Sequence, residues 1–142
     1  MIIKNRMKKY AGIILLLLVS LTSFAQKKPA LKDSVVKTRI LFIFDASQSM
    51  WGLMDGETKI AIAQRLLSAA IDSLKNLENV EVALRVYGNR KPIGKDAQDC
   101  EDTHLEVPFE KDNIERIKHV IKATRPTGTT LIARSLEASE TD

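Results

Sequence analysis

Three short side chains that carry oxygen atoms follow an apolar segment near the middle of the chain. Asp45, Ser47 and Ser49 stand at alternate positions directly after residues 39–44, which are apolar apart from Arg39. In an extended or tightly turning segment, this spacing points the three side chains the same way, so their oxygen atoms can converge. Carboxylate and hydroxyl oxygens are ligands of a hard divalent cation such as Mg²⁺. The spacing therefore predicts a cation site, although the same residue types also form turns and cap helices.

The elements next to these residues predict an α/β arrangement. Residues 39–44 do not alternate and are rich in Ile and Phe, which is typical of a central parallel strand covered on both faces. Apolar residues at helical spacing predict a helix over 58–77, and strict alternation predicts a second strand over 80–87. Strand, helix and strand in this order imply a right-handed crossover and a parallel pair. Ligand sites in such sheets lie beyond the carboxyl ends of the strands, where Asp45 would lie.

The rest of the chain predicts one further strand and two further helices. A polar loop at 88–103 leads to a short strand at 105–108, and its proline favours an edge position. Asp112 with Glu115 three residues later predicts a capping box at the start of the next helix.

A tight turn at residues 127–130 opens the last predicted helix, in which we expect Ile132, Ser135 and Leu136 to face inward. A doubly wound, Rossmann-like, mostly parallel sheet flanked by helices needs more strands than these. We therefore expect the domain to be incomplete at its C-terminus.

The beginning of the chain predicts an export signal. Residues 1–25 combine a basic start, an apolar stretch and small residues before Gln26. The apolar stretch is shorter than the roughly 20 residues that span a bilayer, although an uncleaved anchor is the alternative. We expect a signal peptide at 1–25, a flexible lead-in at 26–38 and one domain at 39–142. The product should be periplasmic or secreted, and should meet a membrane only through this signal.

Charge argues against nucleic-acid binding once the signal is set aside. The chain has 22 Lys and Arg and 18 Asp and Glu, and residues 1–25 hold four of the bases and none of the acids. The remainder is close to neutral, so the high isoelectric point does not indicate a nucleic-acid partner. Cys100 is the single cysteine, which excludes an internal disulfide and a multi-cysteine metal site. It is either a free thiol or a partner for a cysteine elsewhere.

Several other polar and aromatic residues have simpler interpretations. Trp51 is expected to cover the strand ends or to anchor a partner, and Asp55 and Glu57 to cap and charge the first turn of the helix. His104 and His119 have no neighbouring ligand at metal-binding spacing. The loop charges are expected to be solvated or to steer a partner: Arg90, Lys91, Lys95, Asp96, Asp99, Glu101 and Asp102.

The chain resembles the von Willebrand factor type A domain with its metal-ion-dependent adhesion site, from about residue 38 onward. The resemblance is carried by FDASQSMWG at 44–52, YGNR at 87–90, CED at 100–102 and the GTT turn at 128–130. These motifs look like a bacterial exported branch of the family. The resemblance implies that Ser47 and Ser49 bind a metal directly and that Asp45 holds the site together.

The same resemblance implies a threonine ligand from the second loop. Thr130 matches it, and Thr129 is the alternative because the register across the two threonines is open by one residue. The family also uses a later aspartate after a fourth strand. Thr141 and Asp142 do not follow an apolar strand, so they are not assigned to that position.

These observations predict a binding module rather than an enzyme. Two hydroxyls and one carboxylate leave a Mg²⁺ ion (or Mn²⁺ or Ca²⁺) underneutralised, with room for an Asp or Glu from a protein partner. One alternative is a structural domain of this fold that does not use the ion. Another is Mg²⁺-dependent phosphoryl transfer, against which stand the serine at position 47 and the export signal. Serine hydrolysis is disfavoured because the sequence has no Gly-x-Ser-x-Gly elbow.

Overall fold

The computed structural model describes residues 36–94 and 100–142. The predicted signal peptide at 1–25 and most of the lead-in at 26–38 lie outside these residues. Within the described ranges, no helix is both long enough and apolar enough to cross a bilayer.

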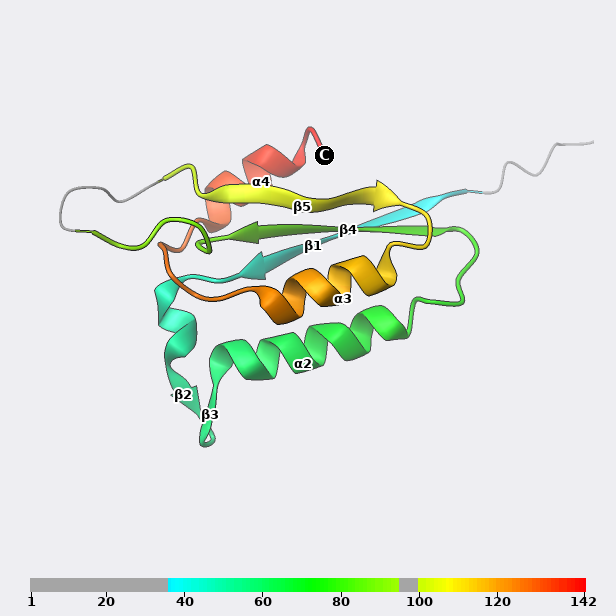
Figure 1. Cartoon of the computed structure of the whole chain (residues 1–142). Helices are drawn as coiled ribbons and strands as arrows, with labels where there is room; N and C mark the ends of the chain where they lie inside the picture. Colours follow the sequence, from blue (N-terminus) through cyan, green and yellow to red (C-terminus); the bar gives the residue numbers. More distant parts are fainter. Residues whose placement is uncertain (1–35, 95–99) are drawn as a thin grey trace, which may run out of the picture. The chain divides into compact units, whose positions relative to one another are not determined.

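A three-stranded mixed sheet forms the centre of the domain (Figure 1). Its order is β1 (Thr38–Asp45), β4 (Val80–Tyr87) and β5 (Thr103–Glu110). β1 and β4 are parallel in a register that runs from Thr38 beside Val80 to Asp45 beside Tyr87. The predicted parallel pair is confirmed, and the α/β fold with flanking helices is confirmed for a small, partial sheet. The sequence pattern predicts that β1 is central, but in the described sheet β4 is the central strand and β1 lies at an edge.

The third strand runs antiparallel to β4 at the edge of the sheet. This agrees with the edge position that Pro108 predicts, because proline cannot donate a ladder hydrogen bond. β5 is longer than the predicted 105–108, since Thr103 already pairs with Tyr87. The pairing between β4 and β5 is irregular on both sides of Leu84 in β4, where the register shifts.

Helices cover both faces of the sheet (Figure 1). α2 (Lys59–Asp72) and α3 (Ile114–Ala123) lie side by side on one face, and α4 (Ile132–Ser139) lies on the other. Between β1 and α2 the chain forms the 3₁₀ turn η2 (Gln48–Trp51) and a hairpin of β2 (Leu53–Met54) and β3 (Glu57–Thr58). α2 is shorter than the predicted helix and ends at Asp72, where a series of turns leads to β4.

The hydrophobic core lies between the sheet and the α2–α3 pair. Alternate residues of β4, namely Val82, Leu84 and Val86, are buried there. They pack with apolar side chains from β1, α2, β5 and α3: Phe44, Ile60, Ile71, Val107, Ile117 and Ile121. Burial of this apolar surface is the main stabilising contribution to the fold and holds the carboxyl ends of β1 and β4 together.

The other face of β4 is polar and meets α4. Arg85 is buried there; its Nε donates to Asp142 Oδ2 at 2.8 Å and its Nη1 to Thr103 Oγ1 at 3.3 Å. Ser135 Oγ donates to the same Thr103 hydroxyl at 2.9 Å. The side of α4 that faces the sheet therefore makes a polar contact through Ser135.

That polar contact overturns part of the expectation for the last helix. Ser135 is buried as predicted, but Ile132 and Leu136 are 58% and 56% exposed. The sequence pattern suggested an apolar inner face, whereas the helix turns its serine toward the hydroxyl and guanidinium groups of the sheet, which need hydrogen-bond partners.

The start of α3 also differs from the predicted capping box. The N-cap is Asn113, and Asp112 has a φ of 61° that is unusual for a residue other than glycine. Instead of capping the helix, the Asn113 side chain donates to the carbonyl oxygens of Val82 at 2.6 Å and Pro108 at 2.9 Å. It therefore joins the beginning of α3 to both β4 and β5.

Replacement of Asn113 by alanine should lower the free energy of unfolding by about 2 kcal/mol, because two carbonyl groups lose a shared donor near the core. Urea denaturation followed by circular dichroism measures the change. Asn76→Ala, in the exposed turn after α2, is the matched control and should change stability by less than about 0.5 kcal/mol. Equal effects of the two substitutions would contradict this role for Asn113.

Candidate metal centre

The carboxyl end of β1 brings Asp45, Ser47 and Ser49 together. Asp45 Oδ1 accepts a hydrogen bond from the Ser47 backbone N–H at 2.7 Å, which closes a tight turn directly after the strand. The hydroxyl oxygens of Ser47 and Ser49 lie 3.0 Å apart. Ser47 is buried and Ser49 is exposed, so the pair runs from the interior to the surface.

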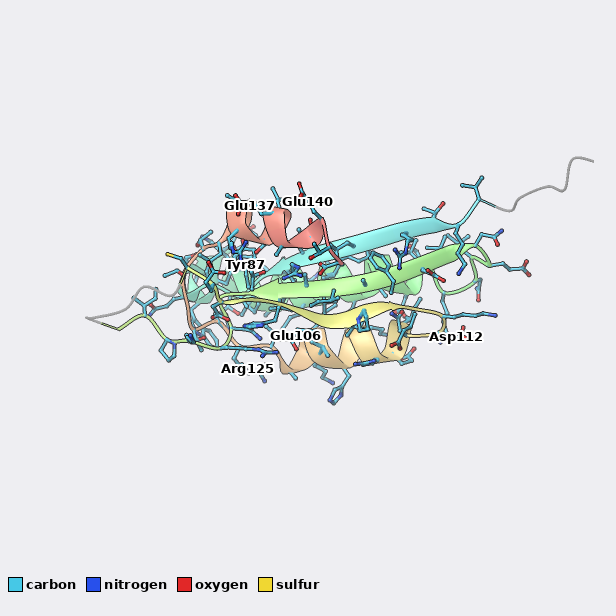
Figure 2. The ribbon with its side chains drawn as sticks, turned by 90° about the horizontal axis from the view of Figure 1, so that it is seen from above. Tyr87, Glu106, Asp112, Arg125, Glu137 and Glu140 are labelled. Carbon is cyan, nitrogen blue, oxygen red and sulfur yellow. The ribbon has the colours of Figure 1, made fainter. Side chains whose placement is uncertain are left out.

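Tyr87 lies beside Asp45 at the end of the neighbouring strand. Asp45 and Tyr87 are register partners at the ends of β1 and β4. Burial raises the pKa of the Tyr87 hydroxyl, and the negative charge of Asp45 and a hydrogen bond to it raise that pKa further. The phenol thus stays a neutral donor to the carboxylate. Figure 2 shows Tyr87 at the same end of the sheet as Arg125 and at the opposite end from Asp112.

The turn before α4 lies against residues 45–49, which we call the serine segment. Ser47 and Gly128 form an isolated parallel bridge, and the Gln48 N–H donates to the Gly128 carbonyl at 2.8 Å. The Thr127 N–H donates to the Ala46 carbonyl at 3.2 Å. Residues about 80 positions apart in sequence are therefore joined by backbone hydrogen bonds, as a site built from both segments requires.

The two candidate threonines differ in exposure. Thr129 is 8% exposed, whereas Thr130 is exposed and lies two positions before Ile132, the first residue of α4. The backbone carbonyl of Thr129 packs closely against Gly88. Thr129 therefore belongs to the packed part of the turn. The turn thus presents Thr130, and not Thr129, to solvent.

Gly88 allows the segments to meet. It has a φ of 70°, and its carbonyl accepts from the N–H groups of Thr127 at 3.1 Å and Gly128 at 2.8 Å. A methyl group at this position would lie 2.6 Å from the Thr129 carbonyl oxygen and 2.9 Å from Ser47 Cα. Both the left-handed backbone and the close approach exclude a side chain here.

Asp102 supports the same region, which the sequence pattern does not reveal. The pattern groups Asp102 with the solvated loop charges, but the residue is only 2% exposed. Its Oδ2 accepts from the N–H groups of Arg90 and Lys91, each at 3.0 Å, and its backbone carbonyl accepts from Gly88 N–H at 2.9 Å. A buried aspartate before a strand has no periodic signature that separates it from neighbouring exposed acids, so only the fold identifies it.

The remaining charges of this loop behave differently from Asp102. Arg90 pairs with Glu106 at 2.7 Å, and Glu101 pairs with Arg134 of α4 at 2.7 Å. His104 Nε2 lies 3.5 Å from Asp102 Oδ1, an oxygen that has no hydrogen-bond partner among the described residues. Cys100 is exposed. Lys95, Asp96 and Asp99 lie outside the described residues.

The hairpin after η2 corrects two further expectations. Asp55, with a φ of 53°, and Gly56 form its turn, and Glu57 pairs with Arg65 at 3.1 Å. Neither acid caps α2, because the cap is Thr58, whose hydroxyl accepts from Ala61 N–H at 3.4 Å. Trp51 is half exposed, and its indole N–H donates to the Pro126 carbonyl at 2.9 Å.

The spacing of the hydroxyl groups fits a small octahedral cation. Two neighbouring ligands of Mg²⁺, each at about 2.1 Å from the ion, lie roughly 3.0 Å from one another. The hydroxyl oxygens of Ser47 and Ser49 already have this separation. Among residues 36–94 and 100–142 there is no group of three or more His, Cys, Asp or Glu side chains that could hold a metal. A cation at this site would therefore depend on hydroxyl ligands.

Comparison with known proteins identifies the fold. No protein-family model and no curated protein matches the sequence. Among solved structures, the vWF domain of the type V pili tip protein Mfa5 from Porphyromonas gingivalis aligns over 75% of this chain and 32% of its own length, with 24% identity and a TM-score of 0.51. The chain has a von Willebrand factor type A-like fold.

Two other solved structures have a similar fold. BatB from Bacteroides thetaiotaomicron aligns over 72% of this chain and 44% of its own length, with 20% identity and a TM-score of 0.53. The PilB minor pilin from Streptococcus sanguinis aligns over 71% and 24%, with 18% identity and a TM-score of 0.55. This VWA-like chain thus spans less than half the length of these structures, and identities this low show the fold alone.

Replacement of Gly88 by alanine should destabilise the VWA-like domain by at least about 2 kcal/mol, because the positive φ is strained and the methyl group would strike backbone atoms. Thermal and urea unfolding measure the loss. Gly94→Ala is the control, since a methyl group there meets no atom within 4 Å. A Gly88→Ala variant as stable as the control would show that the two loops do not need this close contact.

Proposed function

We propose that this VWA-like domain is an exported binding module that recognises a protein partner through a divalent cation. Asp45, Ser47, Ser49 and Thr130 would hold the cation, and an Asp or Glu carboxylate of the partner would complete its coordination. The observation that supports this most directly is the 3.0 Å separation of the Ser47 and Ser49 hydroxyl oxygens beside the Asp45 carboxylate. The function is binding, with no catalytic step.

The chemistry of these ligands favours an open site. Two neutral hydroxyls and one carboxylate leave a divalent ion with uncompensated positive charge and with coordination positions for water or an outside oxygen. Oxygen ligands and the short hydroxyl separation favour Mg²⁺, with Mn²⁺ and Ca²⁺ as further candidates. A carboxylate from outside would supply both the missing charge and the missing ligand.

The choice of Thr130 over Thr129 rests on exposure and on the backbone. Thr129 is packed against Gly88 through its carbonyl, whereas Thr130 is exposed beside the bridge between Ser47 and Gly128. Thr130→Ala should therefore weaken cation binding more than Thr129→Ala does, and the reverse order would assign the ligand to Thr129.

An exported location fits the same proposal. Residues 1–25 have the pattern of a signal peptide, and residues 26–38 would link it to the domain. Similar folds occur in a pilus tip protein and in an aerotolerance-related membrane protein from Bacteroides fragilis. We therefore place the module in the periplasm or outside the cell, where its partner would be another protein.

Substitution of Ser47 or Ser49 by alanine should weaken Mg²⁺ or Mn²⁺ binding by roughly tenfold or more, because each removes a direct oxygen ligand. Isothermal titration calorimetry on the chain measures the affinity. The free energy of unfolding without metal should fall by no more than about 1 kcal/mol, since the Ser47–Ser49 hydrogen bond is partly exposed.

Ser73→Ala is the control for these variants, because Ser73 is an exposed serine at the far end of α2. It should leave cation affinity unchanged. If the natural sequence binds neither Mg²⁺ nor Mn²⁺, or if Ser47→Ala and Ser49→Ala bind as well as Ser73→Ala, the proposal is wrong. Partner binding that persists in EDTA would instead favour a structural domain that does not use the ion.

A further inference from the structure

A group of large apolar side chains lies exposed next to the serine segment. Trp51, Leu53 and Met54 are 50%, 70% and 48% exposed. Single exposed apolar residues are common on protein surfaces, but three within four positions form a patch that more often marks an interaction site. We call residues 51–58, which carry this patch, the hairpin arm.

The hairpin arm is held in one conformation. β2 and β3 pair through Leu53 with Thr58 and Met54 with Glu57, across the turn at Asp55 and Gly56. The Trp51 indole donates to the Pro126 carbonyl, and the Gly52 N–H donates to the Ser49 carbonyl at 3.1 Å. The backbone of the arm and the Trp51 side chain are therefore tied to the region of Ser49, which lowers the backbone entropy lost when a partner binds.

The charge beside the arm favours an acidic partner. The Lys59 amine lies close to Gly52, because a methyl group added at Gly52 would be 3.7 Å from Lys59 Nζ. On the arm itself, the negative charge of Glu57 is paired with Arg65. A cation held by Ser47 and Ser49 would add further positive charge at the base of the arm. Asp55 at the exposed turn of the arm is also negative, so the attraction for a carboxylate comes from Lys59 and the proposed cation at the base of the arm.

We propose that the hairpin arm is the apolar half of the docking surface, and that the partner presents an acidic residue with a large apolar residue as its neighbour. The carboxylate binds at the serine segment while the apolar side chain packs on the arm. This inference rests on the proposed function for the carboxylate, and adds what the partner must carry beside it. Buried apolar contact supplies affinity, and the carboxylate supplies the direction of docking.

Capped dipeptides test this requirement directly. Acetyl-aspartyl-leucine amide and acetyl-leucyl-aspartate amide, titrated into the chain with Mg²⁺, should bind roughly fivefold more tightly than acetyl-aspartyl-glycine amide in at least one of the two orders. NMR chemical-shift titration measures these weak affinities. The double variant Leu53→Ser/Met54→Ser should abolish the preference, with an unchanged affinity for Mg²⁺.

Leu66→Ser is the matched control, because Leu66 is 58% exposed on α2 outside the arm and its loss should leave the preference intact. Equal affinity for the leucine and glycine peptides, or a preference that survives the double variant, overturns the inference even if Mg²⁺ binds. Failure of every peptide to bind at millimolar concentration overturns it as well. A preference that depends on the arm but is unchanged in EDTA supports the arm while contradicting the cation in the proposed function.

Discussion

The close approach of three backbone segments at Gly88 is the constraint on which the candidate site depends. The Gly88 carbonyl receives the N–H groups of the turn before α4, while its missing side chain leaves space for Ser47 and Thr129. Gly128 is equally crowded, because a methyl group there would lie 2.8 Å from the Lys91 carbonyl oxygen. Two glycines thus let backbone hydrogen bonds align the serine segment with the threonine turn.

The sheet and its polar face supply the frame for this contact. Parallel register places Asp45 beside Tyr87, so the phenol can hold the carboxylate at the carboxyl end of the strands. On the far side of β4, Arg85 and Thr103 bind Ser135 and Asp142, which fixes α4 and with it the turn that α4 follows. Asp102 secures the intervening loop through the N–H groups of Arg90 and Lys91.

These contacts give the site a rigid base and an open surface. Ser47 and Asp102 are buried and bonded to backbone groups, whereas Ser49, Thr130 and the hairpin arm are exposed. A rigid base would hold the Ser47 and Ser49 hydroxyl oxygens at their 3.0 Å separation, which would reduce the free-energy cost of binding the proposed cation. The exposed half is the part available to a partner, and its mixture of hydroxyl groups and apolar side chains agrees with a protein ligand.

The sequence by itself determined the parallel β1–β4 pair and the helix between them, because burial imposes residue patterns that are visible without coordinates. It also determined the edge position of β5, because Pro108 cannot donate a ladder hydrogen bond. It also predicted that Asp45, Ser47, Ser49 and the Gly128 turn form one candidate site. Only the tertiary structure decided that Asp102 is buried, that Asn113 joins α3 to two strands, and that α4 turns Ser135 inward and leaves Ile132 and Leu136 exposed. Those outcomes depend on hydrogen-bond partners distant in sequence, and a local pattern carries no information about which polar groups will meet.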